Sequence, residues 1–187
     1  MSPPYDRRAR FEDVVSTVFD PLQRYIRRRV PGSEVDDILA DALLILWRRL
    51  DDVPGDDPLP WSYGVARRTL ANHRRAGERR LRLLDRLSQD AAFGHAAQPS
   101  FDPEGDIDDE RLAVAFASMR PSDQEVLRLW AWEALEPRDI ATALGLTPNA
   151  ATIRLSRARR KLGDAMTRQV VASTGQKPVE HEEGSDG

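Results

Sequence analysis

The sequence predicts an all-α protein made of two small helical domains joined by a flexible acidic linker. Apolar residues recur at helical spacing in both halves of the chain, and residues 136–162 show the pattern of two helices joined by a tight turn. Residues 88–110 carry acidic groups, no Lys or Arg, and little periodicity. The predicted boundaries are an N-terminal helical bundle at 8–86, the linker at 87–108, a C-terminal helix-turn-helix domain at 109–167 and a disordered acidic tail at 168–187.

The amino-acid composition and charge limit the kinds of protein and of binding site that this chain can form. The chain has 187 residues, a formal net charge of −3 and no cysteine, which excludes disulfides and thiolate zinc sites and fits a reducing cytosol. No apolar run reaches membrane length, and the first ten residues lack a signal-peptide core, so we expect a cytoplasmic protein without membrane insertion. Basic residues concentrate in 67–82 and 138–162, which suggests DNA binding that depends on a further component.

The N-terminal segment predicts two short helices after a loose, polar start at residues 1–10. Apolar residues first share one helical face at Phe11, Val14, Val15, Val18 and Phe19. Asp20 and Pro21 resemble a cap followed by a first helical residue, so a second helix is expected to begin there. That helix would direct Tyr25 inward and end in the solvated arginines 27–29, before the break at Pro31-Gly32.

Residues 33–50 form the clearest predicted helix. Ser33 and Asp36 fit a capping-box-like start, and a stripe of buried apolar residues follows. Leu44, Ile45 and Trp47 widen the apolar arc beyond one stripe. Such a helix is either central to its own domain or docks a partner, and Ile45 beside acidic residues favours docking.

The next helix combines aromatic and basic side chains. Residues 51–60 are a Pro, Gly and Asp loop, and Pro60 opens the helix. Trp61 and Tyr63 lie just upstream of a face rich in arginine, and unstacked bases need planes to stack on and cations for their phosphates. For Trp61 alone, core packing is the competing interpretation. His73 has no partner at metal-ligand spacing and is expected to lie on the helix surface.

The helix-turn-helix prediction rests on local stop and start signals. Pro137 suits a first helical position after Glu136, which is a weak cap, and Gly145 supplies the left-handed conformation that ends a helix. Thr147 then caps the second helix. Apolar residues at helical spacing form the buried face of that helix, namely Ala151, Leu155, Ala158 and Leu162.

A support helix is expected before this motif. Ser122 and Glu125 read as its capping box, and Trp130 and Trp132 are expected to pack the helical hairpin.

Three motifs in this order resemble a bacterial sigma factor of the extracytoplasmic-function type, over about residues 11–165. They are VDDILADALLILWRRL, PWSYGVARRTLANHRR and, after the acidic linker, RPSDQEVLRLWAWEALEPRDIATALGLTPNAATIRLSRARRKL. The resemblance implies a region 2 domain that docks on core polymerase and melts the −10 element, and a region 4 domain that reads the −35 element. The implied partners are core RNA polymerase, through its clamp helices and flap, promoter DNA and an anti-sigma factor.

The resemblance also assigns residues to each contact. Core-polymerase docking falls on Asp37, Asp41, Leu44, Ile45, Trp47 and Arg48. Binding of −10 DNA falls on Trp61, Tyr63, Arg67, Arg68, Asn72, Arg74 and Arg75. Binding of −35 DNA falls on Asn149, Thr152, Ile153, Arg154, Ser156, Arg157 and Arg160. The first half of a recognition helix enters the major groove, where an outward Ile153 would cover a thymine methyl.

No enzyme site, cofactor or metal site is expected. The carboxylates lie in surface pairs or the linker, no Gly-rich phosphate loop occurs, and the histidines are dispersed at His73, His95 and His181. Two alternatives stay open. One is a stand-alone helix-turn-helix transcriptional regulator with an N-terminal dimerisation bundle, which would bind duplex DNA without polymerase. The other is an interaction protein that sequesters a partner through its apolar helices.

Overall fold

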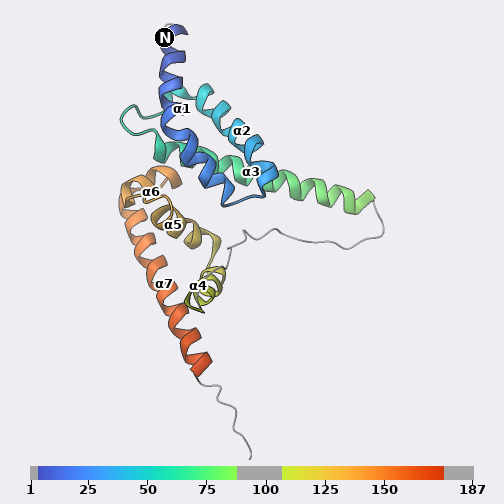
Figure 1. Ribbon diagram of the computed structural model, residues 1–187, viewed down its shortest axis with the longest axis vertical. Coiled ribbons are helices and arrows are strands. Elements are labelled where there is room, and N and C mark those ends of the chain that lie inside the picture. Colours follow the sequence, from blue (N-terminus) through green and yellow to red (C-terminus); the bar gives the residue numbers. More distant parts are fainter. Residues whose placement is uncertain (1–3, 88–106, 175–187) are drawn as a thin grey trace, which may run out of the picture.

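The fold is entirely helical in the part of the chain that the structure, a computed structural model, describes: residues 4–87 and 107–174 (Figure 1). The helices are α1 Pro4–Arg27, α2 Val35–Arg48, α3 Leu59–Leu87, α4 Ile107–Ala117, α5 Pro121–Ala131, α6 Pro137–Leu144 and α7 Pro148–Thr174, with 3₁₀ turns at Gly32–Glu34 and Leu50–Asp52. The all-α prediction is therefore confirmed. Most of the predicted linker and tail lies outside the described residues. Within them, no helix is both long enough and apolar enough to cross a membrane.

The N-terminal domain is a bundle of α1, α2 and α3, which pack against one another in all three pairs. Its core is formed by the predicted apolar stripes, and its fully buried members include Val18, Leu22, Ile38, Leu46 and Leu50. Fully burying such a side chain contributes about 1.5–3 kcal/mol, so the periodic apolar positions hold this bundle together.

α1 is one continuous helix, so the prediction of two helices split at Pro21 is wrong. A proline inside a helix removes one backbone hydrogen bond and costs about 3 kcal/mol. On either side of it, Val18 and Leu22 are completely buried against the bundle. Packing along the whole helix therefore outweighs the local signal for a break.

The first turns of α1 are also ordered, although residues 1–10 were expected to be loose. Arg7 donates to the Trp47 carbonyl at 2.8 Å and to the Asp51 carboxylate at 2.9 Å, and Arg10 donates to the Val53 carbonyl at 2.9 Å. These bonds tie the start of α1 to the end of α2 and to the loop that follows it. A segment that looks polar in sequence is thus fixed by partners forty or more residues away.

The C-terminal domain contains α4 to α7, and its turn follows the predicted signals. Gly145 adopts the left-handed conformation at φ 66°, and the Leu146 N–H bonds back to the Ala141 carbonyl at 2.9 Å, which closes the end of α6. The Thr147 hydroxyl accepts from the Ala150 N–H at 3.2 Å and so caps α7, as predicted. α7 continues to Thr174, so residues 168–174, predicted as the start of the tail, are helical; no Pro or Gly interrupts them.

Both predicted capping boxes are wrong. Ser33 lies in the 3₁₀ turn, and α2 begins at Val35 without a side-chain cap. α5 begins at Pro121, also without one, and the Glu125 carboxylate accepts a hydrogen bond from Tyr25 instead. Glu125 is thus drawn away from its own helix by a partner in the other domain.

The two domains meet along α3 and α6, which lie side by side (Figure 1). Buried residues of both domains form one continuous apolar cluster. At the contact, a Cβ placed on Gly64 would lie 2.9 Å from the Ala143 carbonyl oxygen, closer than side chains approach a backbone atom. A glycine at this position is what lets the two helices approach so closely.

Removing the Leu46 side chain should therefore destabilise the N-terminal bundle. Leu46 is fully buried, so Leu46→Ala is expected to lower the free energy of unfolding by about 2–5 kcal/mol, through lost burial and the cavity left behind. Leu44 on the same helix is 44% exposed, and Leu44→Ala serves as the matched control, with an expected change within about 0.5 kcal/mol. Urea unfolding followed by circular dichroism measures both; equal losses would contradict the assigned core.

Candidate polymerase and nucleic-acid interfaces

The docking candidates on α2 mostly share one exposed face. Asp37, Asp41, Leu44 and Arg48 follow one another at spacings of four, three and four residues, and all four are exposed. The large apolar side chain of Leu44 stands between acidic and basic neighbours on this face. A surface of this composition fits a protein partner, and its contact with polymerase stays a prediction.

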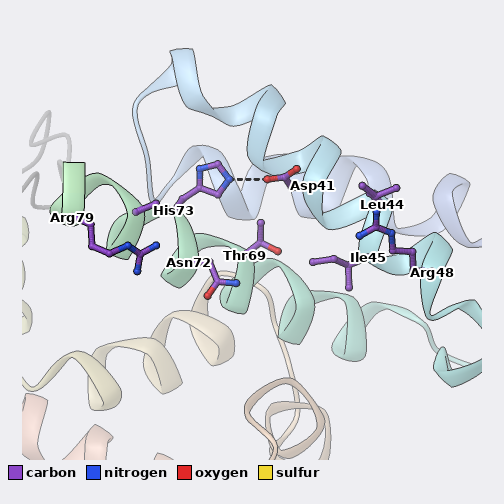
Figure 2. Close-up of a pocket in the computed structure, with 9 residues that line it drawn as sticks. Asp41, Leu44, Ile45, Arg48, Thr69, Asn72, His73 and Arg79 are labelled. Carbon is purple, nitrogen blue, oxygen red and sulfur yellow. Dashed lines mark hydrogen bonds and ion pairs between the residues drawn. The ribbon is translucent and has the colours of Figure 1, made fainter. Parts of the chain in front are cut away.

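A groove joins this face to α3 (Figure 2). Asp41, Leu44, Ile45 and Arg48 line it from α2, and residues of α3 line the other side, namely Thr69, Asn72, His73, Ala76 and Arg79. His73 Nε2 lies 2.9 Å from Asp41 Oδ2, so these two side chains connect the helices across the groove. No local pattern predicts this pair, because its members are 32 positions apart.

Ile45 and Trp47, the other two docking candidates, are only partly exposed. The Trp47 ring meets Phe11 edge to face with 5.1 Å between centroids, and the Arg7 guanidinium lies 5.4 Å from it. Trp47 thus anchors α1 on α2. We infer that it supports the docking face from behind, because a ring held in this way is not free to rotate towards a partner.

The −10 candidates divide between two faces of α3. Trp61, Arg68, Asn72 and Arg75 follow helical spacing along one side, where Trp61 is half-buried and the other three are exposed. On the other side, Tyr63 and Arg67 turn towards α1 and the C-terminal domain, as does Arg74, which donates to the Arg29 carbonyl at 3.3 Å. These seven residues therefore do not form a single surface.

The solvent face of α3 gathers positive charge around an aromatic ring. The Arg49 guanidinium lies 5.3 Å from the Trp61 ring. Burial, and then the nearby charges of Arg67 and Arg49, lower the pKa of Arg68 below its usual value. Asp52 pairs with Arg49 at 2.8 Å, and the remaining arginines on this side of α3 leave a positive potential that attracts a phosphate backbone.

Tyr63 lies on the covered face and is only 3% exposed. Its ring is 5.1 Å from that of Tyr25, and its hydroxyl lies 3.4 Å from the Glu133 carboxylate, to which it donates. Burial, followed by the Glu133 charge, raises the pKa of Tyr63. In this arrangement the Tyr63 ring has no free face on which a base can stack.

Tyr63 belongs to an interdomain cluster, which we define as Tyr25, Arg29, Tyr63, Glu125 and Glu133. Tyr25 donates to Glu125 at 2.7 Å, and the Arg29 guanidinium lies 3.5 Å from Glu125 and 3.4 Å from Glu133. Arg29 also stacks on the Tyr25 ring at 3.5 Å. The first three residues come from the N-terminal domain and the two glutamates from the C-terminal domain, so charge and hydrogen bonds hold the halves together.

One sequence-based interpretation fails at this cluster, and one of its residues was missed. Arg29, expected in a solvated helix end, is 6% exposed. Glu133 was not singled out at all, yet its side chain is 4% exposed and also accepts from Arg28. An unpaired charge at such depth costs several kcal/mol, which makes the pairing obligatory. No local pattern marks these residues, because each partner lies in the other half of the chain.

The −35 candidates all lie where the sequence predicted, on the exposed side of α7. They are Asn149, Thr152, Ile153, Arg154, Ser156, Arg157 and Arg160, and each is exposed. The opposite face is anchored by the buried residues Ala151, Leu155 and Ala158. Ile153 is 42% exposed, so an apolar side chain stands among polar and basic ones without a packing role.

Trp130 and Trp132 do not pack the hairpin as expected. They are 40% and 39% exposed, and each carries a guanidinium over its ring: Arg159 at 4.7 Å from Trp130, and Arg28 at 5.6 Å from Trp132. The apolar space of the hairpin is already filled by Val126, Leu129 and Ile140, so the larger rings remain at the surface. There they cover the stems of arginines.

The buried tyrosines predict a pH dependence. Burial and the nearby Glu125 raise the pKa of Tyr25, as burial and Glu133 do for Tyr63. A raised folded-state pKa gives stability that is fully present below the unfolded value of about 10 and is lost as the pH rises through the folded-state value.

Titration of phenolate absorbance is therefore expected to show these two tyrosines ionising later in the folded chain than in concentrated guanidinium chloride. Tyr63→Phe should remove part of the delayed signal. Coincident folded and unfolded titrations would contradict the buried cluster.

Comparison with known proteins agrees with this arrangement. The family described as Sigma-70 region 2 matches residues 14–80, and the family described as Sigma-70, region 4 matches residues 109–162. A probable RNA polymerase sigma factor, RfaY of Xanthomonas campestris pv. campestris, is 35% identical over 143 residues, which are 72% of this chain and 34% of the relative. The chain thus spans about a third of that relative's length.

Shorter relatives and solved structures extend the comparison. The RNA polymerase sigma factor NccH of Alcaligenes xylosoxydans xylosoxydans is 26% identical over 136 residues, 71% of this chain and 73% of the relative. The fold is shared with CnrH in complex with the cytosolic domain of CnrY, with a TM-score of 0.54, 23% identity and coverage of 84% and 88% of the two chains. It is also shared with RpoE of Bartonella quintana in complex with the anti-sigma factor NepR, at TM-score 0.57, 20% identity and 84% and 96% coverage.

Two family matches in this order cover more than half of the chain and coincide with its two helical domains. The chain therefore belongs to the sigma-70 family, as an RNA polymerase sigma factor of the extracytoplasmic-function type with a region 2 and a region 4 domain.

Proposed function

We propose that this protein docks on core RNA polymerase and directs promoter-specific initiation, with α7 reading the −35 element and α3 holding the melted −10 element. The observation that carries the proposal is the face of α7 from Asn149 to Arg160. It is exposed, mostly polar or basic, and held rigidly by a buried opposite face. This is the combination that a recognition helix needs in a major groove.

In this proposal the N-terminal domain binds core polymerase. The exposed face of α2, with Asp37, Asp41, Leu44 and Arg48, meets the clamp helices, while Ile45 and Trp47 support it. The groove beside it places Asn72 next to this face. Docking and −10 binding are then adjacent, so a strand melted at the polymerase surface arrives directly at α3.

On α3, basic side chains and aromatic rings together bind a single DNA strand. Arg68 and Arg75 contact phosphates, Trp61 stacks on a base, and Asn72 reaches a base edge. Tyr63 is covered by the C-terminal domain in this structure and would stack on a base only where the two domains part. Capturing splayed bases offsets unstacking costs of a few kcal/mol, which drives melting without any catalytic group.

On α7, the first half of the helix reads bases. Asn149, Thr152, Ile153 and Ser156 lie at base edges, and Arg154, Arg157 and Arg160 hold phosphates. Each reader binds weakly alone. Core polymerase fixes their spacing, so the second contact becomes intramolecular and the affinities combine.

The proposed partners are thus core polymerase, through its clamp helices and flap, and promoter DNA, in the cytoplasm where polymerase acts. An anti-sigma factor is a further proposed partner. Two solved structures of this fold are complexes of a sigma factor with CnrY or with the anti-sigma factor NepR, which supports the proposal for this chain.

Reconstituted transcription tests the function. Purified core enzyme with this protein is expected to initiate at a small subset of genomic fragments, detected by sequencing run-off transcripts, whereas core alone should show no such selection. Tight binding of the isolated chain to duplex DNA, together with no core-dependent initiation, would favour the stand-alone regulator instead.

Ile153→Ala is expected to relax the preference for one −35 thymine by about 1 kcal/mol, roughly fivefold, because the methyl contact is lost. Arg160→Ala should instead weaken binding to all sequences and reduce the salt slope by about one. Competition binding of the polymerase holoenzyme to promoter variants measures both. A uniform loss for Ile153→Ala would contradict its assignment to a base.

A further inference from the structure

We propose that the last turns of α3 form a second DNA contact, in which Arg79 and Arg82 hold the phosphate backbone of the duplex between the −10 and −35 elements. The inference rests on the proposed function of α3. It adds two residues to those assigned to DNA and a contact that does not depend on base sequence.

Helical spacing places both arginines on the side of α3 that is assigned to the −10 strand. Along that side, Arg68, Asn72, Arg75, Arg79 and Arg82 succeed one another at intervals of four, three, four and three residues, and all are exposed. Arg75 donates to the Asn72 side-chain oxygen at 3.0 Å, so these two side chains share the surface. Arg79 also lines the groove beside the docking face of α2 (Figure 2). The surface proposed for the melted strand therefore continues directly into Arg79 and Arg82.

This end of α3 projects from the N-terminal bundle (Figure 1). Residues 74–82 are exposed at every position. A Cβ placed on Gly77 would have nothing within 4 Å. Since helices in proteins gain most of their stability by packing one face, a helix exposed on all sides gains from a partner.

Charge complementarity identifies that partner as nucleic acid. Residues 74–82 contain five arginines and one acid, Glu78, although the whole chain has a formal net charge of −3. Glu78 meets Arg82 at 3.2 Å, with side chains that are 61% and 69% exposed. So exposed a pair contributes little, and a phosphate can replace the carboxylate. A row of cations with a single acid along it complements a phosphate backbone.

The residue types of this segment favour duplex over melted DNA. No Phe, Tyr or Trp occurs at positions 64–82, so the segment offers cations to phosphates but no ring on which an unstacked base can rest. From Arg75 to Arg82 the helix advances about 10 Å, which is about three base pairs of duplex. The chain leads from α3 towards region 4, whose α7 is proposed to read the −35 element. The duplex on this side of the −10 element is therefore the spacer between the two elements.

The salt dependence of promoter binding by the holoenzyme tests the contact. Each phosphate contact adds about 0.9 to the slope of log affinity against log salt, so Arg79→Ala should lower the slope by about 0.9 and the double variant with Arg82→Ala by about 1.8. Between about 50 and about 200 mM salt, the parent should then lose about twelvefold more affinity than the double variant. Alanine is the best helix former, so these changes preserve α3.

Arg80→Ala is the matched control. Arg80 is exposed, lies in the same projecting segment and carries the same charge, but it points about 100° around the helix from Arg79. This variant is expected to keep the salt slope of the parent. Equal reductions for Arg79→Ala and Arg80→Ala would mean that only overall charge matters, which would overturn the assignment of Arg79 to a phosphate.

The choice of DNA separates duplex from melted strand. Fluorescence anisotropy measures holoenzyme binding to a promoter fragment recovered by run-off transcription, and to the single-stranded −10 segment of the same promoter. Arg79→Ala should weaken binding only to the fragment that contains duplex. Methylphosphonate linkages, which remove phosphate charge, in the spacer next to the −10 element should abolish the difference between Arg79→Ala and the parent. A difference that persists on either the single strand or the uncharged spacer would overturn the duplex contact.

Assembly with core polymerase in the absence of DNA distinguishes a protein partner. The parent, Arg79→Ala and Arg80→Ala are expected to bind core equally. A loss confined to Arg79→Ala would assign this side of α3 to polymerase and overturn its assignment to DNA. If the parent directs no selective initiation, the proposed function fails and this contact fails with it. If the parent initiates selectively but Arg79→Ala keeps the full salt slope, the contact alone fails.

Discussion

A guanidinium buried between two carboxylates of the other domain determines how the halves of this chain meet. Arg29, in the turn that follows α1, reaches Glu125 and Glu133, and none of these charges can stay at that depth alone. Exposed ion pairs such as Arg8 with Glu12 contribute little by comparison. The domains therefore either share the cluster or expose it to water, with no stable intermediate arrangement in which one charge remains buried and unpaired.

This constraint sorts the functional faces into two groups. The proposed docking face of α2 and the proposed recognition face of α7 are exposed in this arrangement of the domains. The side of α3 with Tyr63 lies at the junction and is covered. The two groups therefore differ in whether this arrangement of the domains leaves them accessible to a partner.

The sequence was sufficient to predict structure where the signals are local. It was insufficient where the interacting residues lie far apart in the chain. Gly145 and Thr147 identified the turn of the helix-turn-helix, since a left-handed glycine and a hydroxyl cap act within a few residues. The α7 face followed from helical spacing alone. Pro21 led to the wrong prediction of a helix break, because the burial of side chains on both sides of it outweighs its local cost to the helix. The capping box predicted at Glu125 was wrong for a related reason. Its carboxylate accepts a hydrogen bond from Tyr25, one hundred positions away, and does not cap its own helix.

A double-mutant cycle on Tyr25→Phe and Glu125→Gln tests the central claim most directly, with the population of molecules whose domains are in contact, measured by energy transfer between dyes on the two domains, as the readout. Among the described residues, these side chains make the shortest hydrogen bond between the domains, at 2.7 Å. The account predicts coupling: the double variant should separate the domains little more than either single variant, with an interaction energy of about 0.5–3 kcal/mol. Strictly additive effects would mean that the two groups do not meet in solution, which would contradict this arrangement of the domains.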